Sequence, residues 1–154
     1  MADTFRVSIA DEKIKRALLG LMACVANPRP VLKVIGERML RHTEKSFTKE
    51  TSPEGKKWKA VGEKTAARKR NPKILTEQGE AGGLRGTLAY SLEGMDALLV
   101  GANKPYARIH QLGGEAGRNK AVKIPARPYL GISAEAEADI LDVISRAIKK
   151  SLDG

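Results

Sequence analysis

The stretch KPYARIHQLGGEAGRNKAVKIPARPYLG, residues 104–131, decides how this chain folds. It opens with an aromatic and histidine cluster, passes through a polar segment with three glycines, and ends in the segment Ile124–Gly131. An ordinary helix–loop–strand connection can have a similar composition. Proline, however, has a fixed φ, lacks an N–H for a sheet ladder, and holds the residue before it in an extended conformation. Pro125 and Pro128 therefore predict a stiff, extended segment at the edge or a bulge of a sheet.

N-terminal to this stretch, hydrophobic periodicity predicts one strand and two helices. Alternating apolar residues at 5–9 predict a strand within an N-terminal strand or arm, residues 1–10. Asp11 can cap a helix whose apolar residues share one face. Asn27 and Pro28 end that helix and begin another, which we expect to extend to about Thr48.

The middle of the chain combines turn residues with short elements. Trp58 lies among lysines, and we expect it to anchor a loop to the core. The other expected elements are a turn at Ser52–Gly55, a short basic helix at Thr65–Arg70, a short amphipathic segment at Leu84–Ser91, a hairpin turn at Glu93–Asp96 and a strand at Ala97–Gly101.

The C-terminal third predicts two more helices around a loop. A helix at Tyr106–Leu112 should end at Gly113, and a long final helix should begin after Ser133 as its cap. Residues 113–123 offer little apolar area to offset the cost of ordering the backbone, so we expect a flexible loop that becomes ordered on assembly. The complete pattern predicts an α+β fold in a single domain, residues 1–154, in which N-terminal helices and a C-terminal helix pack on an antiparallel sheet.

Composition limits the class of protein. Its longest apolar runs are shorter than the roughly 18 residues that span a membrane, and acidic residues occupy the N-terminal positions where a signal peptide has basic ones. We therefore expect no membrane contact and synthesis in a cytoplasm. The single cysteine, Cys24, lies among apolar residues and is expected to be a buried, reduced thiol.

Positive charge is concentrated in one part of the chain. Residues 41–73 contain eleven Lys and Arg against four Glu, which accounts for +7 of the formal net charge of +10. Such a patch can bind nucleic acid, bind an acidic partner surface, or only keep the protein soluble. The residues that we expect to face DNA or a partner are Lys56, Lys57, Lys59, Lys64, Arg68, Lys69 and Arg70.

The sequence contains no arrangement of residues typical of a catalytic site. One cysteine and two histidines do not supply a usual zinc site, and the glycines after Leu112 lack the spacing of a phosphate-binding loop. His110 has no acidic residue nearby in sequence to orient its imidazole. We therefore expect a protein that is not an enzyme and that uses no metal and no cofactor.

Several short segments, taken in order, resemble the phage virion morphogenesis family, the tail completion proteins of Mu-like and P2-like tailed bacteriophages. They cover roughly residues 31–152, and the two most specific are the block Tyr106–Gly113 and the block Ile124–Gly131. The other matching segments are Ile35-Gly36 with Phe47, Ser52–Gly55 with Trp58, Thr65 with Lys69, Ile74-Leu75, Leu84-Arg85 and Val100-Gly101.

The resemblance implies a structural virion protein of a tailed phage or prophage, assembled in the cytoplasm of the bacterial host. Proteins of this kind act as tail completion or tail terminator proteins at the head–tail junction, and related folds are α+β and commonly form hexameric rings. The implied partners are copies of the chain itself, the tail tube and the head-connector proteins. Non-specific contact with packaged DNA is a further expectation, and the family has no catalytic residues to carry over.

Two classes of function stay open at this point. In the first, the chain assembles into a ring, and the subunit or partner interface includes Tyr106, Arg108, His110, Arg127 and Tyr129. In the second, it is a free-standing nucleic-acid-binding module that uses the basic patch. For Arg127, the flanking prolines fix the backbone, so we expect its guanidinium to be presented outward with little entropy to lose.

Overall fold

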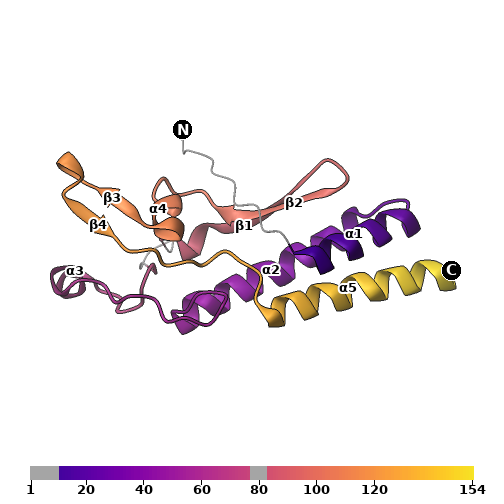
Figure 1. Cartoon of the computed structure of the whole chain (residues 1–154), viewed down its shortest axis with the longest axis horizontal. Helices are drawn as coiled ribbons and strands as arrows, with labels where there is room; N and C mark the ends of the chain where they lie inside the picture. The colour runs from indigo at the N-terminus through magenta and orange to yellow at the C-terminus, as the bar shows by residue number, and fades with distance from the viewer. Residues whose placement is uncertain (1–10, 77–82) are drawn as a thin grey trace. The chain divides into compact units, whose positions relative to one another are not determined.

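A computed structural model describes residues 11–76 and 83–154 and confirms the α+β class (Figure 1). The expected strand at residues 5–9 lies outside the described residues. The elements, in chain order, are α1 (Glu12–Cys24), α2 (Arg29–Lys49), α3 (Glu63–Arg68), the 3₁₀ turn η1 (Arg85–Thr87), β1 (Leu88–Glu93), β2 (Ala97–Ala102), α4 (Ala107–Leu112), β3 (Gly114–Ala116), the 3₁₀ turn η2 (Arg118–Lys120), β4 (Val122–Ile124) and α5 (Ala134–Asp153). None of the helices in the described ranges is long and apolar enough to cross a membrane.

The described residues separate into two compact units, each with its own hydrophobic core. Unit 1 comprises residues 43–76, 83–89 and 101–131, and unit 2 comprises residues 11–42, 90–100 and 132–154. The boundaries fall inside α2, β1 and β2, so these three elements contribute residues to both units. Whether both units unfold together as the expected single domain stays a prediction.

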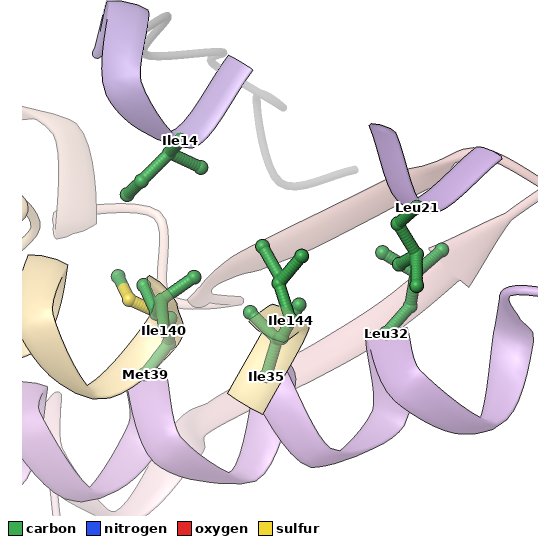
Figure 2. Packing of buried hydrophobic residues seen from close by; sticks show 7 residues of the cluster. All are labelled: Ile14, Leu21, Leu32, Ile35, Met39, Ile140 and Ile144. Atoms are coloured by element: carbon green, nitrogen blue, oxygen red, sulfur yellow. The ribbon is translucent and has the colours of Figure 1, made fainter. Parts of the chain in front are cut away.

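The core of unit 2 is built from three helices whose apolar faces meet. Asp11 caps α1 by accepting hydrogen bonds from the N–H groups of Lys13 and Ile14, and Ser133 caps α5 by accepting from the N–H of Ala136. Both caps confirm the prediction, as does the start of α2 next to Asn27. Figure 2 shows the residues of α1, α2 and α5 that form this core: Ile14, Leu21, Leu32, Ile35, Met39, Ile140 and Ile144.

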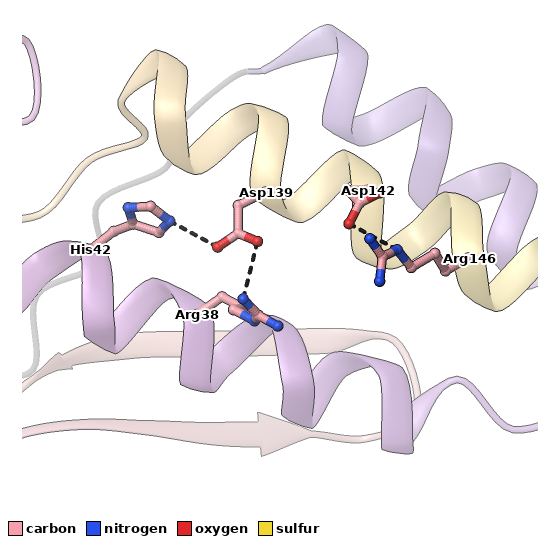
Figure 3. Close-up of polar contacts among 5 residues, drawn as sticks. All are labelled: Arg38, His42, Asp139, Asp142 and Arg146. Atoms are coloured by element: carbon pink, nitrogen blue, oxygen red, sulfur yellow. Dashed lines mark hydrogen bonds and ion pairs between the residues drawn. The ribbon is translucent and has the colours of Figure 1, made fainter.

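Polar contacts join the same helices at their surface. The Asp139 carboxylate of α5 lies between two side chains of α2, 2.9 Å from Nε2 of His42 and 3.4 Å from Nη1 of Arg38 (Figure 3). Asp142 pairs with Arg146 one helical turn further along α5, at 3.0 Å. Asp139 therefore links α5 to α2, Asp142 pairs within α5, and the two carboxylates are not arranged as a metal site.

Two predictions about local structure are wrong. Cys24 is exposed at the end of α1, where the next residue, Val25, packs against the core in its place. The segment Leu84–Ser91 is not one amphipathic piece, since η1 leads directly into β1. Half-buried and exposed residues alternate along β1, which is the period of a strand with one covered face.

The strands form two separate two-stranded sheets, β1–β2 and β3–β4. Residues 94–96 form the turn between β1 and β2, within the predicted turn at Glu93–Asp96, whose first residue ends β1. Within the expected loop 113–123, Gly114 pairs with Ile124, Glu115 with Lys123 and Ala116 with Val122, in antiparallel register. Asn119 and Lys120 adopt the left-handed conformation that closes this tight ribbon. The segment is thus a short hairpin in secondary structure, and its mobility and ordering on assembly stay a prediction.

Two glycines inside helices of unit 2 have opposite surroundings. A Cβ on Gly36 of α2 would lie 2.5 Å from Cδ2 and 2.6 Å from Cγ of Tyr90, so the ring of Tyr90 packs directly on this part of the helix backbone. A Cβ on Gly20 of α1 would lie 3.7 Å from Cδ1 of Ile148, an ordinary contact distance.

We therefore predict opposite effects for the same substitution at these two positions. Gly20→Ala should raise the free energy of unfolding by up to about 1 kcal/mol, because alanine restricts the helix backbone. Gly36→Ala should lower it by about 1–2 kcal/mol, because displacing the tyrosine ring outweighs the same gain. Urea denaturation of both variants measures the difference, and equal stabilities would show that the contact with Tyr90 is unimportant.

Candidate functional site

The segment Ile124–Gly131 is extended but leaves the sheet at its first residue, where β4 ends. Its backbone groups are bound mainly by side chains from other parts of unit 1. We call this arrangement the polar clamp, and its members are Trp58, Gln111, Arg127 and Tyr129. The extended course agrees with the prediction, but the segment is not the edge or a bulge of a sheet beyond Ile124, and its stiffness stays a prediction.

Gln111 of α4 binds the segment as a neighbouring strand would. Its Oε1 accepts hydrogen bonds from the N–H groups of Tyr129, at 3.0 Å, and Leu130, at 2.9 Å. Its Nε2 donates to the carbonyl oxygen of Leu130, at 2.9 Å. One buried side chain thus satisfies three backbone groups that a sheet partner would otherwise have to satisfy.

Arg127 and Trp58 connect the same segment to residues 58–60. The guanidinium of Arg127 is buried and donates from Nε to the carbonyl oxygen of Lys59, at 2.7 Å, and from Nη2 to that of Ala60, at 3.1 Å. Burial lowers the pKa of Arg127. In the opposite direction, Nε1 of Trp58 donates to the carbonyl oxygen of Pro128, at 2.8 Å, which confirms Trp58 as a loop anchor.

Tyr129 lies at the aromatic centre of unit 1. Its side chain is fully buried, and its hydroxyl donates to the carbonyl oxygen of Ala107, at 3.1 Å. Burial raises the pKa of Tyr129 to about 12. The ring of Phe47 lies 5.4 Å from that of Tyr129 and 5.3 Å from that of Trp58, in the tilted and edge-on orientations that aromatic pairs prefer.

Close backbone approaches explain two of the glycines. Gly113 ends α4 with a φ of 75°, and a Cβ there would lie 2.9 Å from the backbone nitrogen of Ala126. A Cβ on Gly131 would lie 2.8 Å from Cγ of Pro53. The two sequence blocks that carried the resemblance therefore pack against each other and against the turn at Ser52–Gly55.

His110 is half-buried in α4, and its ring meets that of Tyr106 edge-on at 5.7 Å. Its carbonyl oxygen accepts a hydrogen bond from the N–H of Arg127, at 2.7 Å, whereas its Nδ1 is buried without a partner among the described residues. Burial and the positive charge of Arg127 lower the pKa of His110. The neutral imidazole is therefore the form that this site favours.

The five residues expected at an interface have different exposures. Arg108 is exposed, Tyr106 and His110 are half-buried, and Arg127 and Tyr129 are buried. The expected outward presentation of the Arg127 guanidinium is wrong for the isolated chain. The flanking prolines fix the backbone, but two nearby carbonyl groups decide where the side chain points. Contact of these residues with a neighbouring subunit stays a prediction.

The basic patch contains two kinds of side chain. Lys57, Lys69 and Lys73 donate to carbonyl oxygens of Lys49, Lys73 and Thr48, and two of these oxygens lie at the C-terminal end of α2, where cations are favourable. Lys56 lies 3.7 Å from Glu54, and both side chains are highly exposed. Among the seven residues expected to face DNA or a partner, four have side chains without a hydrogen bond or ion pair to the described part of the chain: Lys59, Lys64, Arg68 and Arg70.

Comparison with known proteins shows the family of this chain. A model of the phage virion morphogenesis family matches residues 9–149. The chain belongs to this family. The chain is 35% identical over 133 residues to Mu-like prophage FluMu G protein 2 of Haemophilus influenzae, covering 86% of this chain and 87% of the relative. It is 31% identical over 146 residues to putative capsid assembly protein G of Escherichia phage Mu, covering 90% of this chain and 92% of the relative. No solved structure matches the chain.

This member of the phage virion morphogenesis family holds its extended segment with a residue that sequence reasoning did not select. Gln111 is inside the block Tyr106–Gly113, but its importance comes from contacts 18 and 19 residues away. A polar residue between Ile109 and Leu112 on a short helix was the available signal. Among the described residues, no three His, Cys, Asp or Glu side chains are grouped to hold a metal ion.

The polar clamp predicts that Arg108 and Arg127, one in each family block, contribute differently to the free energy of unfolding. Arg127→Ala should lower the free energy of unfolding by about 2–4 kcal/mol, because two hydrogen bonds from a charged donor and the packing of a buried side chain are lost. Arg108→Ala, the exposed control, should change it by less than about 0.5 kcal/mol. Urea denaturation measures both. If Arg127→Ala were as stable as wild type and failed only to assemble, Arg127 would be an interface residue and not an internal tether.

Proposed function

We propose that this chain is a tail completion protein of a Mu-like phage or prophage, acting as the tail terminator at the head–tail junction. The observation that carries the proposal is the family match over residues 9–149, nearly the whole chain. The relatives include Mu-like prophage G proteins and a protein named putative capsid assembly protein G, and this last name agrees with the virion morphogenesis of the family name. The site supports an assembly role because its polar side chains bind the chain's own backbone.

The proposed mode of action is assembly into a ring, with six copies as the expected number. A closed ring needs a heterologous interface, in which one patch of a copy meets a different patch of the next. The β3–β4 ribbon is suited to such a contact, since a two-stranded sheet leaves both outer edges free to pair. Val122 in the ribbon and Leu112 next to it are more than half exposed and offer apolar area for such a contact. Tail tube and head-connector proteins are the proposed partners on the two faces of the ring.

We also propose that the chain is not an enzyme. The side chains of Tyr129 and Arg127 are already engaged, because both donate to carbonyl oxygens. Burial and the positive charge of Arg127 lower the pKa of His110, which disfavours its protonated form. The alternative function, a free-standing nucleic-acid-binding module, would act as a monomer. The proposed tail terminator and this alternative differ in whether the purified protein forms rings.

Light scattering at several concentrations, with negative-stain images, tests the proposal. We predict a mass that rises with concentration to about 100 kDa, six times the 16.7 kDa of one chain, and ring-shaped particles. Val122→Asp should prevent assembly, because it places a charge on the exposed apolar part of the ribbon. Leu152→Asp, at a similarly exposed apolar position on α5, is the matched control and should assemble.

A monomer at every concentration would contradict ring assembly. In a prophage that encodes this chain, deletion of its gene should leave heads and tails that do not join. Wild-type protein supplied in trans should restore joining, and Val122→Asp should not. Normal virions from the deletion strain would overturn the proposed place in tail completion.

A further inference from the structure

The positive charge of the chain belongs to one of its two units. Within the described residues, unit 1 contains seventeen Lys and Arg against five Asp and Glu, whereas unit 2 contains ten of each. The patch predicted from sequence, residues 41–73, is thus part of a larger imbalance that is confined to unit 1. An imbalance of this size attracts an anionic partner to that unit alone.

Seven of the seventeen cations of unit 1 interact with other described residues through their side chains, and residues 59–70 carry four of the others in one short segment. They carry Lys59, Lys64, Arg68 and Arg70, whose side chains have no partner among the described residues, and Glu63 is the one acid among them. Helix α3 lies inside this segment and buries none of its side chains. Lys64 and Arg68 are four residues apart, so they project from the same face of α3.

The base of this exposed segment is fixed by the polar clamp. The carbonyl groups of Lys59 and Ala60 accept the two hydrogen bonds from the buried guanidinium of Arg127. At its other end, the Lys69 side chain donates to the carbonyl of Lys73, and Ile74 is buried in the core of unit 1. Between these ends, Val61 packs against the core of unit 1, whereas the side chains of α3 are not buried, so α3 can serve as a binding surface.

We propose that Lys59, Lys64, Arg68 and Arg70 bind the phosphate groups of duplex DNA, independently of base sequence. This proposal rests on the proposed function, because a role in the virion is what brings the chain close to packaged DNA. Single-stranded nucleic acid fits less well, because binding of single strands relies on exposed aromatic side chains and Trp58 is buried. A second copy of the chain also fits less well, since unit 2 has as many cations as acids and three of its carboxylates, Glu137, Asp139 and Asp142, already pair with cations.

Two variants with equal charge separate a local surface from a bulk charge effect. The surface variant replaces Lys59, Lys64, Arg68 and Arg70 by Gln. The control variant replaces four exposed lysines of unit 2 by Gln: Lys15, Lys33, Lys149 and Lys150. Each variant keeps a formal net charge of +6, four less than the +10 of the wild type. None of the eight side chains is buried, so both variants should fold, which circular dichroism checks.

Fluorescence anisotropy with a labelled duplex of about 25 base pairs, titrated at about 50–200 mM salt, measures binding by the full chain. For the wild type we expect equal affinity for duplexes of different sequence and a steep loss of affinity with salt. Each phosphate contact contributes about 0.9 to the slope of log affinity against log salt, so the surface variant should lose up to about 3.6 of that slope. The control variant should keep the wild-type slope and bind within about threefold of wild type.

Three results would overturn the proposal. Equal loss in both variants would reduce the effect to net charge. Tighter binding of a single strand than of the duplex would exclude a duplex surface. Binding of polyglutamate with no binding of DNA would assign the surface to an acidic protein. The ring measurement is independent: a surface variant that forms rings but does not bind DNA leaves tail completion intact, and DNA binding without rings overturns only the assembly proposal.

Discussion

The constraint on which unit 1 depends is the need to satisfy backbone groups in a segment that has no strand beside it. Prolines at 125 and 128 make Ile124–Gly131 extended and remove two donors, so a regular ladder is not available. Buried N–H and C=O groups still require partners. The side chains of Gln111 and Trp58 supply these partners. Arg127, which belongs to the segment, in turn donates hydrogen bonds to the carbonyl groups of residues 59 and 60.

This arrangement connects the fold to the proposed function. The segment lies between α4 and the loop that leads into α3, so one clamp positions two surfaces of unit 1. One surface is the ribbon β3–β4, which follows directly on α4 and has free edges for a neighbouring copy. The other is the exposed basic segment 59–70, whose first two carbonyl groups receive Arg127. Because the interior polar groups hold the scaffold, the proposed binding relies on charges and strand edges at the surface.

Sequence reasoning succeeded where local rules determine the structure. The caps at Asp11 and Ser133, the apolar stripes of α1 and α5, and the end of α4 at Gly113 follow from periodicity and from residues within one helical turn. The family was also recognisable, because its short sequence blocks occur in the expected order along this chain. The blocks Tyr106–Gly113 and Ile124–Gly131 are now seen to be in contact through Gln111 and Tyr129.

The failures concern contacts that are distant in sequence. Proline positions fix φ around Arg127, but the direction of its side chain depends on carbonyl groups 67 and 68 residues away. The same holds for Gln111, and for Lys57 and Lys73, whose charges are partly used at the end of α2. Cys24 was assigned to the core from its neighbours, although its place at the end of α1 exposes it.

Amide hydrogen exchange of the wild type and of Gln111→Met tests the central claim, that side chains hold this segment in place of a strand. In the wild type, the N–H groups of Tyr129 and Leu130 should exchange slowly, whereas that of Ala126, which has no partner among the described residues, should exchange fast. In Gln111→Met, protection should be lost at Tyr129 and Leu130 and kept at Arg127, whose N–H binds the carbonyl of His110. Exchange at Tyr129 and Leu130 as fast as at Ala126, or protection that survives the loss of Gln111, would contradict the account.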